Sequence, residues 1–385
     1  MKGAGTSAVV AAAVTILALA WATVARGGHE MSVYPSFYPH DIRIETMPPD
    51  RAARLLAEGN IQAYVGSEPP FPRQRPESLQ PVESLGSIVI VHINPDSPLA
   101  HDNASACSVA RELVRDMAQR HSALIFHPYP VTPFHGDYLY HVDLAEAAKE
   151  RVAAGAPTPA GRSLKVRPDD ALAGTLVRPE WVTRSSNWDV AVEAVSAAKL
   201  LATSTTALNG WLGPPAAKMG WFQAAGLLAG SADEPQMRDR VQAGLQQLAA
   251  GVSEGTVERI NLERQLVLSL TSTCHAAVAG YTVKREYVST EYFRGIENIG
   301  FDSIAGLNSP MFLRTVKLKD FPWNGWLSLG IATPPAAAWN PIGGFTDEFG
   351  RLMWSALSDP ALLPSPNDSG WLLNRISDVQ SHPAR

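Results

Sequence analysis

The longest uninterrupted apolar pattern in the chain lies close to its start, over Ala8–Ala25. No charged residue interrupts this run of about 18 residues, so a helix there would rise about 27 Å, close to the thickness of the hydrocarbon core of a bilayer. Lys2 stands on one side of the run and Arg26 on the other. The pattern predicts that the chain is either anchored in a membrane or exported through one.

Two interpretations of this segment stay open. A cleaved signal peptide has a basic start, an apolar core and small residues before the cut, which Lys2, the apolar run and Ala20–Ala22 provide. The protein would then be secreted to the periplasm. The other interpretation is a single-pass signal anchor over residues 1–28, since the apolar run continues to Ala25. The lipid bilayer of the inner membrane would then be a partner, with the bulk of the chain in the periplasm.

Downstream, the apolar positions predict alternating strands and helices. Asp41–Thr46 alternates as a half-buried strand does, and Ser87–Ile93 is a continuous apolar run typical of a buried strand. Helices are expected at Arg51–Glu58 and Ala104–Arg120, and further strands at Ile61–Val65 and Ala123–Phe126. Two strand–helix–strand units favour right-handed crossovers. We therefore expect an α/β domain with an open, mostly parallel sheet over residues 29–155.

The second part of the chain has a different pattern. Residues 156–180 are rich in Pro, Gly, Ala and charge, which predicts a linker. Residues 181–385 are expected to form an α-helical domain, with helices at Asp189–Leu208, Ala216–Leu228, Gln236–Ala250 and Thr256–Ala279. This domain is Trp-rich, because nine of the ten tryptophans fall at or beyond Trp181.

Composition narrows the possible partners. A net charge of −5 and the absence of a basic tract exclude nucleic acid as the expected partner. The chain has two cysteines, Cys107 and Cys274. They could pair in an oxidising compartment and join the two parts of the chain, or remain free as in a cytosolic protein.

One stretch resembles a known family. The sequence IRIETMPPDRAARLLAEGNIQAYVG, at residues 42–66, resembles part of a type II periplasmic solute-binding domain, in which a strand, an AxxLLxxG helix and a short strand precede the binding cleft. SIVIVHINPDSPLA, at residues 87–100, is similar to the strand and turn that open the next section. The resemblance implies the local fold and a cleft at strand ends, without a particular ligand. It departs from the family where the second α/β lobe would follow, because Trp-rich helices are expected there.

Two groups of polar residues are candidate sites. His101, Asp102 and Ser105 share a loop after a predicted strand, the usual place for ligand contacts, and are candidate ligand-binding residues. In HGDYLYHVD, at residues 135–143, a strand would place His135, Asp137 and His141 on one face, where imidazole and carboxylate could bind a divalent metal. His135 and His141 would lie about 20 Å apart along a strand, so a turn would be needed. The alternative is that these residues line a sheet edge or cleft.

A third candidate is aromatic. The segment LKDFPWNGWLSLG, at residues 318–330, groups Phe321, Trp323 and Trp326 beside a Pro and two Gly. Rings on irregular backbone can form an interface with another envelope protein or with the membrane. The alternative is that they fill the core of a domain with short helices.

The motifs of the common enzyme classes are absent. There is no Gly-x-Ser-x-Gly elbow, Walker loop or His-Glu-x-x-His helix in the chain. We therefore expect an exported or membrane-anchored extracytoplasmic protein with a non-enzymatic binding or complex-assembly role. The alternative is an exported metal-dependent or hydrolytic enzyme that uses the His-rich first domain.

Overall fold

The computed structural model describes residues 39–71, 74–154, 163–203, 215–231, 235–249, 255–319, 325–336, 347–358 and 360–378. The apolar run Ala8–Ala25 lies outside these ranges. No helix within them is long and apolar enough to cross a membrane.

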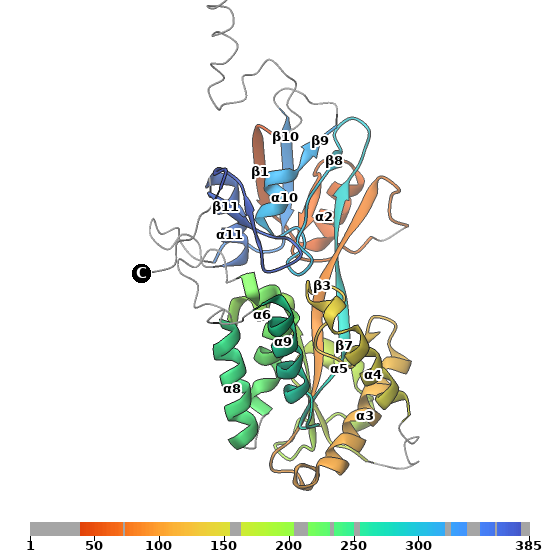
Figure 1. Cartoon of the computed structure of the whole chain (residues 1–385). Helices are drawn as coiled ribbons and strands as arrows, with labels where there is room; N and C mark the ends of the chain where they lie inside the picture. The colour runs from red at the N-terminus through yellow and green to blue at the C-terminus, as the bar shows by residue number, and fades with distance from the viewer. Residues whose placement is uncertain are drawn as a thin grey trace, which may run out of the picture.

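One mixed sheet of eight strands runs through the molecule (Figure 1). Its strand order is β1-β10-β2-β7-β3-β6-β5, and β4 pairs with β7 beside this path. In that order the strands are β1 (Asp41–Thr46), β10 (Trp326–Ile331), β2 (Ala63–Val65), β7 (Ala276–Ser289), β3 (Leu79–Ile93), β6 (Val190–Ser196) and β5 (Val166–Pro168), with β4 at Ile125–Phe126.

The prediction of a mostly parallel sheet is wrong. Among the described strands of this sheet, the pairs β1/β10, β10/β2 and β5/β6 are parallel, whereas β2/β7, β7/β3, β3/β6 and β4/β7 are antiparallel. The strands that the sequence places in succession are not neighbours, because β10 lies between β1 and β2, and β7 lies between β2 and β3. Pairing with strands from distant parts of the chain thus replaces the expected crossovers.

The long strands β3 and β7, of 15 and 14 residues, connect an upper and a lower half of the molecule (Figure 1). The upper half holds β1, β10, β2 and the helices α2 (Pro49–Ala57), α10 (Pro310–Thr315) and α11 (Glu348–Leu357). It also holds two small two-stranded sheets. One pairs β8 (Ile296–Asn298) with β9 (Lys317–Leu318), and the other pairs β11 (Leu362–Pro364) with β12 (Trp371–Leu373). The lower half holds β4, β5, β6 and α3 (Asn103–Arg120), α4 (Val142–Ala153), α5 (Ala171–Leu176), α6 (Ala197–Thr203), α7 (Gly220–Leu228), α8 (Pro235–Ala249) and α9 (Thr256–Leu270).

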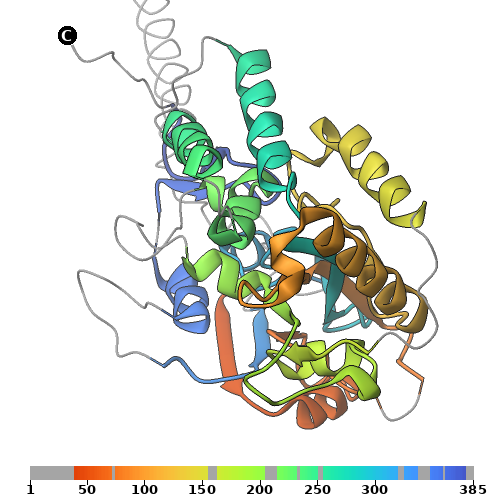
Figure 2. The same cartoon turned by 90° about the horizontal axis from the view of Figure 1, so that it is seen from below.

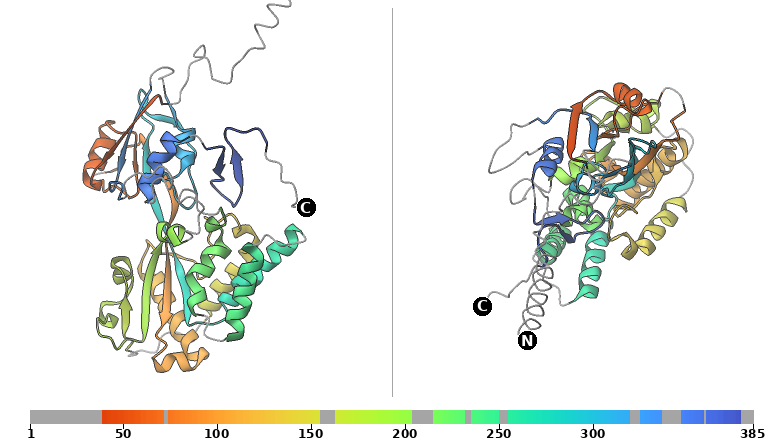
Figure 3. Two further views of the ribbon diagram at one scale, coloured as in Figure 1. Left: turned by 90° about the vertical axis from the view of Figure 1, so that its left-hand side faces the viewer. Right: turned by 90° about the horizontal axis from the view of Figure 1, so that it is seen from above.

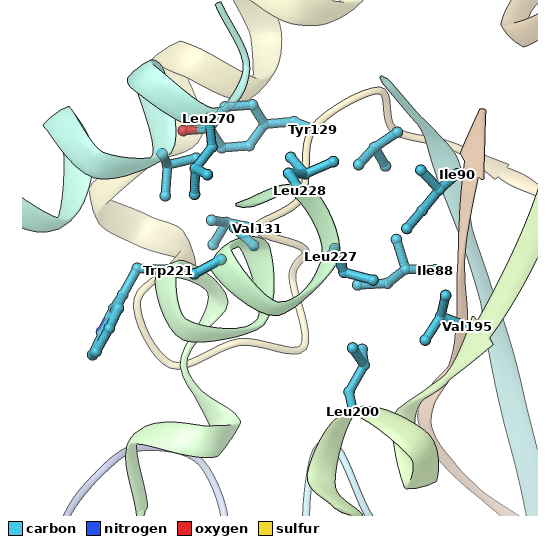
Figure 4. Close-up of a cluster of buried hydrophobic side chains, with 14 of the residues drawn as sticks. Ile88, Ile90, Tyr129, Val131, Val195, Leu200, Trp221, Leu227, Leu228 and Leu270 are labelled. Carbon is cyan, nitrogen blue, oxygen red and sulfur yellow. The ribbon is translucent and has the colours of Figure 1, made fainter. Parts of the chain in front are cut away.

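Helices surround the sheet of the lower half when it is seen from below (Figure 2), and α5 lies on the opposite side of it from α8 and α9 (Figure 3). The continuous apolar run of β3 is explained by this two-sided burial. Ile88 and Ile90 pack in one cluster with α7 and α9, whereas Val89 and Val91 pack in another with α3 and α5. Figure 4 shows Ile88 and Ile90 of β3 pointing toward Leu227 of α7.

The predicted α-helical second domain is wrong, because three strands of the sheet come from it: β6, β7 and β10. The helix expected at Asp189–Leu208 is strand β6 followed by α6, and the helix expected at Thr256–Ala279 ends at Leu270, before β7 begins. A short apolar run such as Val190–Ser196 does not by itself distinguish a buried strand from a helix. A mixed α/β protein built on a central sheet is what the structure shows.

Other predicted elements are confirmed. Strand β1 has the predicted bounds, and β2, α2, α3 and β4 lie within one or two residues of them. The described part of the predicted linker contains β5 and α5. Where the chain divides into independently folding domains stays a prediction.

Cys107 of α3 and Cys274, just before β7, form a disulfide across a sequence separation of 167 residues. The bridge ties the N-terminal part of α3 to the segment just before β7. Of the two alternatives for these cysteines, a disulfide is the one that fits an oxidising compartment.

Candidate functional site

A cavity of about 370 Å³ lies between the two halves, beside the middle of β3 and β7. The upper half contributes residues of α11 and the start of α10, and the lower half contributes residues of α6 and Lys218. Its walls combine apolar and charged side chains, among them Leu85, Ala198, Leu201, Lys218, Lys284, Asp302, Ser309, Glu348, Arg351 and Leu352. A concave, partly apolar space with a few polar groups is the usual form of a small-molecule site.

The strands are distorted where they pass this cavity. The register of β3 on β7 shifts between Leu85 and Ile88, and Ser87 donates its N–H to Thr282 Oγ1 at 3.0 Å. A shift of this kind is a β-bulge, which bends the strand locally. Gly86 lies in the bulge and lines the cavity, and a Cβ there would meet Thr282 within 2.7 Å. We call this part of β3 and β7 the waist.

A buried carboxylate organises the loops at the waist. Glu286 is fully buried, and its two oxygens accept the N–H groups of Gly66 at 2.6 Å and Leu307 at 2.7 Å. Lys284 lies 3.4 Å from the same carboxylate and donates to Ala305 O at 2.8 Å. Gly306 has φ +71°, and a Cβ would overlap with Glu286, so only glycine fits this turn.

An ion pair joins the two halves beside the cavity. Lys218 belongs to the short 3₁₀ helix Pro215–Lys218 of the lower half, and its Nζ lies 2.7 Å from Asp302 Oδ2. Nζ also donates to Ser365 O, in the turn between β11 and β12. Asp302 Oδ1 accepts the N–H groups of Ile304 at 2.9 Å and Ala305 at 3.0 Å, which fixes the carboxylate for Lys218.

Two further polar groups reach the cavity from the upper half. Ser309 is 4% exposed, and its hydroxyl has no hydrogen-bond partner among the described residues. A buried hydroxyl without a partner costs free energy that a bound ligand could recover. Arg351 stands one turn after Glu348 on α11; burial lowers the pKa of its guanidinium, whereas Glu348 and Asp347 raise it.

The predicted ligand-binding residues do not line this cavity. Asp102 is the N-cap of α3, where it accepts N–H groups from Ala104 and Ser105 and the Ser105 hydroxyl. The Ser105 hydroxyl and these N–H groups hold the pKa of Asp102 below its usual value. His101 is exposed at the end of the preceding 3₁₀ turn. The polar pattern of this loop is therefore explained by helix capping.

The predicted strand over residues 135–143 is also wrong. A 3₁₀ turn at Tyr138–Tyr140 leads into α4, and His135, Asp137 and His141 are all buried. Asp137 accepts the N–H groups of Gly220 at 2.8 Å and Trp221 at 3.0 Å, at the start of α7. A carboxylate at a helix N-terminus satisfies free N–H groups and interacts favourably with the helix dipole.

The two histidines have protein partners as well. His135 Nδ1 accepts from Thr132 N at 2.8 Å, and its Nε2 lies 2.9 Å from Gln223 Oε1. Tyr129 OH lies 2.8 Å from His141 Nδ1. Burial lowers the pKa of both histidines. Within the described ranges no three His, Cys, Asp or Glu residues are placed to hold a metal ion, so the metal hypothesis has no support in the structure.

Of the predicted aromatic interface, only Trp326 falls on described residues. It begins β10 and is 65% exposed. Phe321 and Trp323 lie outside the described ranges. The interface stays a prediction.

Sequence reasoning missed the residues that line the cavity. Lys218 and Arg351 come from distant parts of the chain, Asp302 and Ser309 share the segment before α10, and the four residues form no local motif. A strand-end cleft was implied by the family resemblance, but no pattern in the sequence indicates which side chains would meet there.

No protein-family model and no curated protein matches the sequence. Among solved structures, the chain is similar to the periplasmic EDTA-binding protein EppA, with 11% identity, a TM-score of 0.39 and coverage of 66% of this chain and 54% of that one. The substrate-binding protein CtaP from Listeria monocytogenes has 11% identity and a TM-score of 0.40, with 70% and 58% covered. The oligopeptide-binding protein AppA from Bacillus subtilis, solved with a nonapeptide, has 11% identity and a TM-score of 0.37, with 68% and 57% covered.

The chain thus spans little more than half the length of these structures. These structures are binding proteins, the class of protein that residues 42–100 resemble, and all three TM-scores are 0.40 or lower. Likenesses this weak identify no ligand.

Proposed function

We propose that the protein binds a small solute, without chemically transforming it, in the cavity between its two halves. The observation that carries the proposal is the cavity of about 370 Å³ beside the bulged waist of β3 and β7. Pockets of about 300–1,000 Å³ at the junction of two structural units are typical of small-ligand sites.

The charges and the unpaired hydroxyl suggest the kind of solute. Lysine and arginine face the same space as aspartate and glutamate, next to an apolar wall from α6. A polar solute with both a positive and a negative group, such as a short peptide, would match this surface. The hydroxyl of Ser309 would supply one hydrogen bond to it.

The waist would permit opening and closing. Few strands connect the halves, and the bulge at Gly86 interrupts the regular ladder where they meet. Hinges are commonly a few element or loop residues that absorb a change in backbone angles. Exposure of the site outside the cytoplasm is supported by the apolar leader and by the disulfide between Cys107 and Cys274.

The test is ligand-dependent stabilisation measured with a mixture of tripeptides. The natural chain should gain thermal stability in the mixture. Ala198→Trp should abolish the gain, because Ala198 is exposed on α6 and its enlarged side chain would fill the cavity. Ala104→Trp, at an exposed site at the start of α3, is the matched control and should keep the gain. An equal gain in the Ala198→Trp variant would refute the site.

A further inference from the structure

A second cavity, of about 410 Å³, lies within the lower half. It is formed by α3, α4, the end of α9 and the start of β7, and none of its described residues lines the first cavity. The disulfide between Cys107 and Cys274 lies at its edge. This cavity therefore belongs to one half alone and does not depend on how the halves meet.

Its inner surface is mostly apolar. Side chains from α3, α4, α7, α9 and β7 contribute, namely Ala110, Val114, Ala148, Val152, Leu228, Leu268, Ala276, Ala277 and Val278. Tyr129 and Leu228 also belong to the buried cluster drawn in Figure 4, so the cavity reaches the hydrophobic core. Leu268 is 44% exposed and connects the cavity to solvent. Such a surface would bind an apolar group of matching size by removing it from water.

Two arginines give this apolar space a positive charge. Arg111 reaches it from α3 and Arg151 from α4, and no described Asp or Glu lines it. Neither guanidinium forms an ion pair or hydrogen bond with any residue in the described ranges. This contrasts with Arg178 and Arg264, which pair with Asp116 at 2.5 Å and with Asp143 at 2.7 Å.

We infer that this second cavity is a binding site for a small amphiphilic carboxylate, whose apolar body fills the cavity and whose carboxylate pairs with Arg111 and Arg151. Guanidinium groups hold carboxylates through paired N–H donors, and the resulting charge-assisted hydrogen bonds are stronger than neutral ones. Each methylene buried in the apolar part adds favourable transfer free energy. The site is separate from the proposed solute site and does not rest on it.

The experiment compares octanoate with octanol by calorimetric titration of the full chain. The two share an apolar tail, but only octanoate carries the charge that the arginines would bind. We expect octanoate to bind at least 10-fold more tightly than octanol. Arg111→Gln and Arg151→Gln should each weaken octanoate binding about 10-fold, and the double variant should bind both compounds alike.

The control is Arg54→Gln on α2, an exposed arginine of the upper half that does not line the cavity. It should bind octanoate as the natural chain does. Equal binding of octanol and octanoate by the natural chain, or unchanged octanoate binding in the double variant, would overturn the inference. Ala198→Trp fills only the first cavity and should leave octanoate binding intact. A negative result for the solute site can therefore be told apart from a negative result for the carboxylate site.

Discussion

Lys218 and Asp302 form a buried ion pair that joins the lower half of the molecule to the upper half, with Nζ and Oδ2 2.7 Å apart. The two side chains are 9% and 5% exposed. Both line the cavity between the halves, and Ser365 O accepts a further hydrogen bond from Nζ. The pair therefore holds one wall of the proposed solute site against the other.

Removal of the lysine charge is the first prediction. In Lys218→Met the Asp302 carboxylate stays buried without its partner, which should cost about 3–5 kcal/mol of unfolding free energy. Urea denaturation of the two single variants and of Lys218→Met combined with Asp302→Asn measures the coupling. The double variant should lose less than the sum of the two single losses. Additive losses would show that the pair does not act as a unit.

The second prediction concerns the disulfide. Because the bridge between Cys107 and Cys274 closes a loop with a sequence separation of 167 residues, its reduction should lower the unfolding free energy by about 2–5 kcal/mol. Thermal melts with and without dithiothreitol measure the effect. The variant with both cysteines replaced by alanine should melt at the temperature of the reduced natural chain and should not respond to dithiothreitol. A natural chain whose melting is insensitive to reduction would contradict the prediction.

The third prediction is that Glu263→Gln stabilises the protein at neutral and alkaline pH. Glu263 on α9 is 2% exposed, and burial raises its pKa to about 7 although Arg259 lies 3.7 Å away. Between pH 4.5 and 7 the unfolded chain ionises this carboxyl more than the folded chain does, so stability falls as pH rises through that window. The variant should gain about 1–2 kcal/mol at pH 8, and the gain should vanish at pH 4. A gain that is the same at both pH values would have a different cause.

The fourth prediction is that buried histidines lower the stability of the protein as pH decreases, which is the opposite pH dependence to that of Glu263. Burial is the main cause that lowers the pKa of His127, His135 and His141. Below the ordinary histidine pKa of about 6.5 the unfolded chain takes up protons that the folded chain does not, so stability falls as pH decreases. Urea denaturation of Glu263→Gln at pH 7.5 and 5.5 isolates this effect from that of Glu263. A constant unfolding free energy across that range would rule it out.

The fifth prediction is the location of the chain. A reporter fused after Arg385 should be active outside the cytoplasm, because the short flank before Ala8–Ala25 would remain inside. Amino-terminal sequencing of the purified protein then separates the two interpretations of the leader. A new terminus near Thr23 or Arg26 means a cleaved signal, and an intact Met1 or Lys2 means an anchor. Activity of the fusion in the cytoplasm would contradict both.

Local patterns were sufficient for the first elements of the chain. The alternation of Asp41–Thr46 and the Pro-Pro-Asp start of α2 mark a strand and a helix without knowledge of their neighbours. The same holds for α3, because the side chain of its N-cap Asp102 accepts hydrogen bonds from residues two and three positions ahead. In these cases the interactions that decide the conformation lie within a few residues, so the sequence contains them directly.

The sheet and the cavity were decided by the tertiary structure. Val190–Ser196 is a strand because Ser87–Ile93 of β3 pairs with it, across about 100 residues of chain. His135, Asp137 and His141 serve the packing of α7 and the lower core, because their partners Gln223, Gly220, Trp221 and Tyr129 meet them only after folding. Lys218, Asp302 and Ser365 come together for the same reason. The sequence by itself determined the local elements and predicted export from the apolar run Ala8–Ala25. Hydrogen bonds and packing between distant segments determined the strand order and both cavities.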